Sequence, residues 1–237
     1  AVIPDMPPGP EYWLGTNSRG QDMFWQLAAS MRNTLTFGLM VALISRVIAI
    51  VVGLVSGYVG GRTDQIIMAF NDTLGALPNI PILLLLVFVL RDQMNWSVLA
   101  LTAAMLGWTH DSRLIRSAAL SLRTREFTRH AAFSGMRTGQ VLFREHLPYV
   151  MPIVFFTTMN NLIWAIGLEV TLSILGFSDI NRPTIGGMIY WAKVAGIWWW
   201  IAVPMLAVVI LFLGLFLLAM SVNEYIDPRS RLARMGA

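Results

Sequence analysis

The sequence predicts an all-α protein, a bundle of helices that crosses a membrane several times. Hydrophobic residues make up 56% of its 237 residues and charged residues only 13%, about half the share found in soluble domains. The mean hydropathy is +0.64. The apolar residues also gather in runs close to the roughly 20 residues that a helix needs to span a bilayer. Five such runs within residues 35–222 predict a transmembrane domain of five spans.

Residues 1–34 are polar and rich in prolines, so we expect them to precede the first span and to lie outside the cytoplasm. The first span, residues 35–59, carries Arg46 near its middle. A charge at that depth is costly, and we expect Arg46 to pair with a carboxylate in the membrane, Asp72 or Glu169. The end of this span has small residues that allow close helix packing: Gly53, Ser56, Gly57, Gly60 and Gly61.

The second span, residues 66–90, is mostly apolar, and Pro78 and Pro81 predict a kink in it. A short connection at residues 91–95 leads to the third span. That span begins near Trp96 and ends near Trp108, and we expect its helix to continue into the polar residues that follow.

The fourth and fifth spans are predicted at residues 149–175 and 201–222. The stretch between them, residues 176–199, is rich in turn-forming residues and tryptophans, which predicts a loop at the membrane interface. The tail, residues 223–237, is basic and predicted to lie in the cytoplasm.

The longest polar stretch, residues 125–148, belongs to a loop of about residues 113–148 between the third and fourth spans. Residues 124–134 have helical spacing, with Phe127, Ala131 and Ser134 on one face. Gly135 can adopt the left-handed conformation that ends a helix, and Pro148 suits the first turn of the next one. We therefore expect a short helix, a glycine corner and a return to the membrane.

This loop resembles the EAA loop of ABC importer permeases, in which Glu-Ala-Ala precedes a glycine and, further on, a Leu-Pro pair. Gly135 and Leu147-Pro148 match that pattern in register, whereas the acidic position falls on Arg129. Glu126, one turn earlier, is a candidate substitute. The resemblance implies that the helix binds a groove of an ATPase subunit. The residues expected to couple to the ATPase are Glu126, Arg129, His130, Ala131, Ala132, Phe133, Gly135, Met136 and Arg137, with Leu147 and Pro148 at the end of the loop.

Residues 14–22 resemble the LGTDxxGRD stretch of C-type permeases of the dipeptide, oligopeptide and nickel ABC importer family, with Asn17 and Gln21 as departures. Residues 57–61 and 185–188 resemble other parts of the same family. The resemblance implies a type I ABC importer permease fold and a subunit that forms half of a pore for peptides. The family has one more span before this stretch, and we expect this chain to lack it.

The same resemblance implies the partners, namely a second homologous permease, two ATPase subunits that bind ATP and Mg, and an extracytoplasmic substrate-binding protein. The sequence has no phosphate-binding G-x-x-x-x-G-K-[ST] motif, and its one lysine is Lys193. We therefore expect a transport subunit rather than an enzyme, with no catalytic residue, no cofactor and no nucleic acid bound by this chain.

The basic residues set the expected orientation in the inner membrane. With residues 113–148 and the C-terminus in the cytoplasm, eleven Lys and Arg residues lie inside and five outside. This bias agrees with the tendency of positive charge to stay on the cytoplasmic side.

The polar residues predicted within the membrane mark either a transport pathway or internal pairs, and the sequence leaves both roles open. These residues are Arg46, Asp72, Asn160, Asn161 and Glu169. The histidines beside the basic loop are expected to be solvated or to cap helices rather than to bind a metal: His110, His130 and His146.

Other functions are weighed against the permease. An ion-coupled secondary transporter would use Arg46, Asp72 and Glu169 as a relay. An intramembrane enzyme would use His110 and Asp111. Within the importer family, oligosaccharides and nickel chelates are the alternative substrates.

Overall fold

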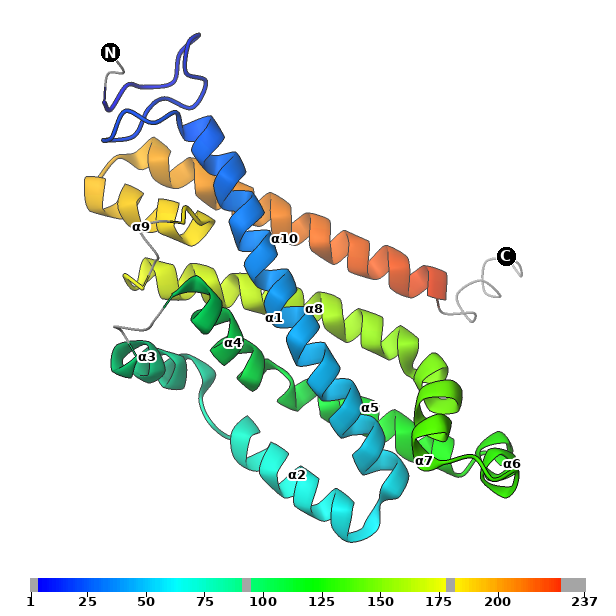
Figure 1. The fold of residues 1–237 in the computed structure, drawn as a ribbon. Helices are drawn as coiled ribbons and strands as arrows, with labels where there is room; N and C mark the ends of the chain where they lie inside the picture. Colours follow the sequence, from blue (N-terminus) through cyan, green and yellow to red (C-terminus); the bar gives the residue numbers. More distant parts are fainter. Residues whose placement is uncertain (1–3, 91–94, 178–181, 227–237) are drawn as a thin grey trace.

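The computed structural model describes residues 4–90, 95–177 and 182–226, and these are helical apart from turns and one isolated bridge between Thr16 and Asp22 (Figure 1). The predicted tail beyond residue 226 and most of the connection at 91–95 lie outside the described residues. The helices are α1 (Met23–Val59), α2 (Gly61–Gly75), α3 (Asn79–Val89), α4 (Trp96–Gly107), α5 (Thr109–Arg123), α6 (Glu126–Phe133), α7 (Thr138–Gln140), the π-helix η1 (Val141–His146), α8 (Leu147–Ile174), α9 (Ile185–Ala195) and α10 (Trp198–Ile226).

Three segments in the described part of the chain are long and apolar enough to cross a membrane: α1, the continuous helix that ends in α8, and α10. A fourth is formed if α2 and α3, bent by 78°, count as one span. The kink predicted from Pro78 and Pro81 is confirmed, because the helix stops after Gly75 and restarts at Asn79. The predicted third span corresponds to α4, which has only 12 residues before α5 follows. The count of five spans stays a prediction.

The first helix starts earlier than the sequence predicted. α1 has 37 residues and begins at Met23, inside the segment assigned to residues 1–34. Asp22 caps it, since its carboxylate accepts a hydrogen bond from Phe24 N at 2.8 Å. Two polar residues in this part of α1, Ser30 and Thr34, are fully buried, whereas Arg32 is exposed.

α1 is the central helix of the bundle and packs on α4, α5 and α8 (Figure 1). A Cβ added at Gly57 would lie 2.6 Å from the carbonyl oxygen of Arg116 and 2.7 Å from Cβ of Ala119, both on α5. A Cβ at Gly53 would lie 2.7 Å from the carbonyl oxygen of Ser112. The predicted close packing at these two glycines is therefore confirmed, and α5 is the helix that they contact.

Residues 185–195 form a helix, α9, where the sequence predicted a loop. Thr184 caps this helix by accepting a hydrogen bond from Gly187 N at 3.1 Å, and Gly196, with φ of 70°, ends it. Gly186 lets α9 approach α8, since an added Cβ would lie 2.6 Å from Cβ of Ser173. The prediction was wrong because tertiary packing on α8 and α10, rather than helix propensity, holds this short helix.

Gly57→Ala is expected to destabilise the protein by about 1–3 kcal/mol, because the added methyl group would overlap α5. Gly214→Ala is the matched control. It lies on α10 with no atom within 4 Å of the added Cβ, and replacing an exposed helical glycine by alanine stabilises by about 1 kcal/mol. Thermal unfolding of both variants in one detergent provides the comparison. Shifts in the midpoint temperature of unfolding that have the same sign and size in both variants would contradict the close contact of α1 with α5.

Candidate functional site

The predicted coupling residues lie on a short helix and a glycine corner at one end of the bundle (Figure 1). α6 spans Glu126–Phe133, and Gly135 follows with φ of 78°, the left-handed conformation that the sequence predicted. Two hydrogen bonds close the helix end, from Gly135 N to Ala132 O at 3.1 Å and from Met136 N to Ala131 O at 3.2 Å. The helix and glycine corner are confirmed.

The buried face of α6 differs from the predicted one. Thr128 and Ala131 are 4% and 8% exposed, and Phe127 is half-buried. Ser134, which was predicted to share this face, is exposed, so that part of the prediction is wrong. The reason is that the helix ends at Phe133, and its spacing does not continue through Ser134.

The opposite face of α6 and the corner after it are open. Phe133 is 89% exposed, more than any other large apolar side chain that the structure describes. Arg129 and Arg137 form no ion pair with any residue that the structure describes. Met136 is half-buried, whereas the other predicted coupling residues outside the buried face are exposed: Glu126, Arg129, His130, Ala132, Phe133, Gly135 and Arg137. This surface combines an exposed apolar ring with two arginines that form no ion pair within the described residues.

The end of the loop continues into the membrane helix. Leu147 and Pro148 occupy the first turn of α8, as predicted, and α7 and η1 precede them without a break. In a regular α-helix the ring of Pro148 would clash with the carbonyl of Arg144, and it has no N–H to donate to that oxygen. A wider π turn directly before Pro148 fits both constraints.

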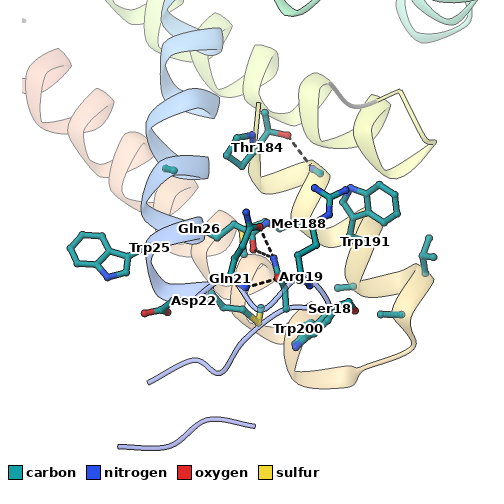
Figure 2. Close-up of a pocket in the computed structure, with 18 of the residues that line it drawn as sticks. Ser18, Arg19, Gln21, Asp22, Trp25, Gln26, Thr184, Met188, Trp191 and Trp200 are labelled. Carbon is teal, nitrogen blue, oxygen red and sulfur yellow. Dashed lines mark hydrogen bonds between the residues drawn. The ribbon is translucent and has the colours of Figure 1, made fainter. Parts of the chain in front are cut away.

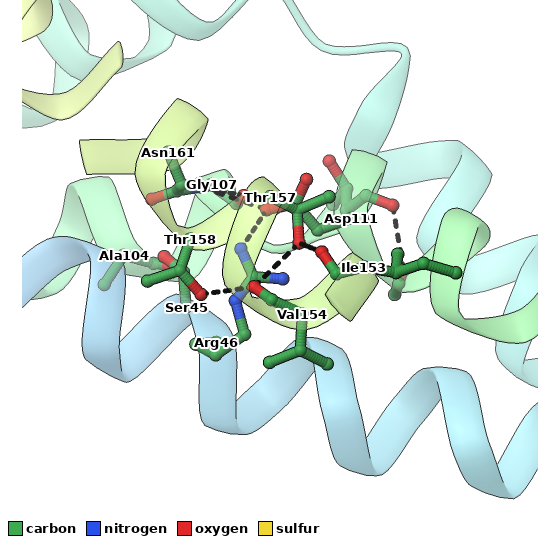
Figure 3. A network of polar contacts seen from close by, with 12 residues as sticks. Ser45, Arg46, Ala104, Gly107, Asp111, Ile153, Val154, Thr157, Thr158 and Asn161 are labelled. Atoms are coloured by element: carbon green, nitrogen blue, oxygen red, sulfur yellow. Dashed lines mark hydrogen bonds and ion pairs between the residues drawn. The ribbon is translucent and has the colours of Figure 1, made fainter. Parts of the chain in front are cut away.

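Arg46 pairs with Asp111, so the predicted partners Asp72 and Glu169 are wrong (Figure 3). Nη2 of Arg46 lies 2.8 Å from Oδ2 of Asp111, and the two side chains are 6% and 9% exposed. The prediction that a carboxylate neutralises Arg46 is confirmed. Asp72 instead pairs with Arg113 at 2.9 Å on an exposed part of α2 and α5.

Asn161 completes the cluster around this ion pair and brings in α8 (Figure 3). Its Nδ2 donates to the carbonyl of Gly107 at 2.7 Å and to Oδ2 of Asp111 at 3.4 Å. Ser45, next to the arginine, donates to an α4 carbonyl at 3.0 Å. Asn160 is exposed and takes no part. The cluster therefore joins α1, α4, α5 and α8, and it contains two of the predicted pathway residues.

Glu169 forms a separate cluster where α1, α8 and α9 meet. It is 3% exposed and accepts hydrogen bonds from Thr34 Oγ1 at 3.3 Å and Ser173 Oγ at 2.7 Å. Thr184 and the backbone of Gly186 also donate to it. Its carboxyl group lies at the N-terminus of α9, where helix backbone N–H groups lack partners within the helix. No described cation pairs with Glu169, and its hydrogen bonds join α9 to α1 and α8.

Asp64 and Arg116 form an ion pair that the sequence analysis missed. Nε and Nη2 of Arg116 donate to the two carboxylate oxygens at 2.6 and 2.5 Å, and the hydroxyl of Ser56 bonds to the same carboxylate. The hydrogen bond to Asp64 raises the pKa of Arg116 above its ordinary value. The contacts join α1, α2 and α5. The sequence offered one signal, an acidic residue just after the small-residue end of α1, but not which arginine meets it.

A cavity of about 790 Å³ lies at the other end of the bundle, between residues 17–29 and residues 182–200 (Figure 2). Arg19 lies in its wall, and its guanidinium carbon is 5.9 Å from the centre of the Trp191 ring. Met188 and Trp200, from α9 and α10, contribute apolar surface. The sequence did not predict this cavity, because α9 was assigned to a loop.

The histidines differ in their surroundings. His110 and His130 are exposed, in line with the expectation that they are solvated. His146 is fully buried and lies 3.0 Å from the hydroxyl of Thr128, so the expectation is wrong for this residue. The π turn that carries it could not be read from the sequence pattern.

Arg46→Met and Asp111→Leu, made singly, each leave one buried charge without its partner. We expect each to destabilise the protein by about 3–5 kcal/mol and the double variant to recover most of that loss. Arg113→Met is the control, because exposed pairs such as Arg113–Asp72 contribute only about 0–1 kcal/mol. Thermal unfolding in detergent measures all four. Single variants as stable as the unchanged protein would show that the buried pair is dispensable.

The chain is similar to known proteins over most of its length. Residues 49–232 match the family described as binding-protein-dependent transport system inner membrane component. The oligopeptide transport system permease protein OppC of Mycobacterium tuberculosis is 33% identical over 97% of this chain and 80% of its own length. The dipeptide transport system permease protein DppC of Bacillus subtilis is 27% identical over 96% of this chain and 72% of its own.

A solved structure has the same fold. A chain of the inward-facing MetNI methionine ABC transporter matches with a TM-score of 0.71 at 15% identity, covering 86% of this chain and 98% of that one. This likeness shows the fold alone, and it confirms the helical permease fold that the sequence predicted. The chain belongs to the family of binding-protein-dependent transport system inner membrane components, the permease subunits of ABC importers.

Proposed function

We propose that this chain forms half of the pore of an ABC importer for peptides and that α6 is the element that couples it to an ATPase. As a permease of this family it is a multi-pass inner membrane protein that works with ATPase and substrate-binding partners. Relatives named for oligopeptide and dipeptide transport favour peptides over oligosaccharides or nickel chelates. The observation that carries the coupling role is the open face of α6, where Phe133 is almost fully exposed and Arg129 pairs with no carboxylate in the described part of the chain.

The contact with the ATPase follows from the chemistry of that face. Phe133 enters an apolar part of the groove on the ATPase, where burial of the ring stabilises the complex. Arg129 stands at the acidic position of the EAA loop and faces acidic groups of the partner instead. Gly135 keeps the corner free of side-chain bulk, since nothing lies within 4 Å of its missing Cβ.

In the orientation expected from the basic residues, α6 lies in the cytoplasm and the opposite end of the bundle lies outside. A second, homologous permease completes the pore, and two ATPase subunits bind ATP and Mg. This chain binds no cofactor and catalyses no reaction. The cavity beside α9 then faces outward, where the substrate-binding protein delivers its ligand (Figure 2).

The transport cycle uses rigid-body motion. ATP-driven closure of the ATPases displaces α6, and the bundle rocks from an inward-facing to an outward-facing arrangement. Peptide enters from the binding protein in the outward-facing state and leaves when ATP hydrolysis resets the bundle.

The polar groups of the bundle argue against an ion-coupled relay. Arg46, Asp72 and Glu169 do not contact one another, and each has its own set of partners. A relay needs neighbouring groups that exchange a proton or an ion. The separate clusters instead fix the positions of the helices.

Uptake of a labelled tripeptide into proteoliposomes is expected when this chain is reconstituted with its partner permease, the ATPases and the binding protein. Uptake should require ATP and should be absent for maltotriose and for a nickel chelate. Omission of the binding protein is the control. Uptake driven by a proton gradient without ATP would contradict the importer mechanism.

Gly135→Val is expected to impair the coupling of ATP hydrolysis to uptake, because a β-branched residue is strained at a φ of 78°. The cost is roughly 1–2 kcal/mol of local conformational energy, enough to displace the end of α6. Gly139→Val is the matched control, since Gly139 also has nothing within 4 Å of its missing Cβ but has no left-handed backbone. Substrate-stimulated ATPase activity at the unchanged level in Gly135→Val would count against the role of this corner.

A further inference from the structure

His146 is a buried imidazole at a junction of three segments. It lies on η1 and is fully shielded from solvent. Its Nε2 is 3.0 Å from Oγ1 of Thr128 on α6. Its ring meets the ring of Tyr58, near the end of α1, edge to face, with the centroids 5.2 Å apart. One side chain thus contacts α6 and α1 while it belongs to the helix that continues into α8.

The hydrogen bonds of the Thr128 hydroxyl determine which imidazole nitrogen of His146 carries a hydrogen. That hydroxyl donates to the carbonyl oxygen of Leu122, at the end of α5, over 2.8 Å. The hydrogen of this hydroxyl is therefore used in the bond to Leu122, and the hydroxyl oxygen accepts a hydrogen bond from Nε2 of His146. This arrangement requires the imidazole tautomer with hydrogen on Nε2. Nδ1 has no hydrogen-bond partner among the described residues. The histidine is thereby held as a hydrogen-bond donor that points at α6.

The π turn sets the direction of this side chain. An α-helix turns by about 100° per residue, so a change of one residue in the register of Val141–His146 would rotate the imidazole away from Thr128. Single π turns inside helices occur most often at functional sites. Here the turn aims His146 at the helix that carries the open face.

A second contact supports the same junction. Phe127 on α6 stacks on Tyr149 in the first turns of α8, with ring centroids 4.9 Å apart and planes 18° from parallel. Phe127 also lies 6.4 Å from the His146 ring. The buried side of α6 is therefore attached to α8 through Phe127 and to both α8 and α1 through His146.

We propose that His146 is a positioning residue that transmits the displacement of α6 to α1 and α8. This inference rests on the proposed role of α6 as the ATPase-coupling helix. A short helix of eight residues that was held only by its flanking loops would yield when pushed. The hydrogen bond to Thr128 and the packing on Tyr58 make α6 move together with the ends of two long helices.

Two isosteric changes test the proposal in the complete, reconstituted importer. His146→Phe keeps an aromatic ring against Tyr58 but removes the donor, and Thr128→Val keeps the shape of the side chain but removes the hydroxyl. We expect both complexes to retain their ATPase subunits and to hydrolyse ATP, but to import up to about tenfold fewer tripeptides per ATP hydrolysed. His146→Gln, whose amide nitrogen can reach the same oxygen, should restore part of that ratio.

Matched controls separate this role from general damage. Thr124→Val removes an exposed hydroxyl that bonds only within its own turn, to Ser121 O at 3.0 Å, and His110→Phe changes an exposed histidine. Both should leave the ratio of peptides to ATP unchanged. If His146→Phe does not fold, Thr128→Val alone carries the test.

The proposal is overturned if Thr128→Val, and His146→Phe where it folds, transports with the unchanged ratio. Loss of the ATPase subunits from these variants would also overturn it, because His146 would then shape the docking surface rather than transmit its motion. A further variant, Phe133→Asp, tests docking itself. If the ATPase still binds this variant, the proposed role of α6 fails, whatever the result at His146.

Discussion

The close contact between α1 and α5 is the constraint on which the rest of the bundle depends. The backbones can meet only because Gly53 and Gly57 carry no side chain. That approach brings Arg46 within 2.8 Å of Asp111, which removes the cost of a lone charge in the membrane. The close packing of α1 on α5 and the neutralisation of Arg46 therefore depend on each other. A side chain that separated the two helices would also separate the ion pair.

Three polar clusters lie along α1 and fix its position against its neighbours. Thr34 meets Glu169 near the start, Arg46 meets Asp111 in the middle, and Ser56 meets Asp64 near the end. Apolar surfaces are non-directional and would tolerate sliding or rotation of one helix on another. Hydrogen bonds have strict distances and angles, so each cluster permits one register. The polar residues therefore specify the arrangement of a bundle that apolar burial stabilises.

The sequence predicted the features that depend on local backbone chemistry. Gly135 ends a helix and the prolines bend one for reasons that act within a few residues. The partner of Arg46 could not be predicted, because helical spacing shows which residues share a face but not which helices are neighbours. α9 was missed for a related reason, since contacts with other helices hold it. His146 required a π turn, and no sequence pattern indicates that register.

α1 also connects the two ends of the protein. Its 37 residues extend over about 55 Å and contain no proline, whereas Pro152 lies within α8 and Pro204 within α10. Tyr58 at one end of α1 contacts His146, and Met23 at the other end lines the cavity beside α9. Prolines are a common cause of helix kinks, and α1 contains none along its length. α1 therefore links the junction at His146 to the wall of the cavity through one continuous helix.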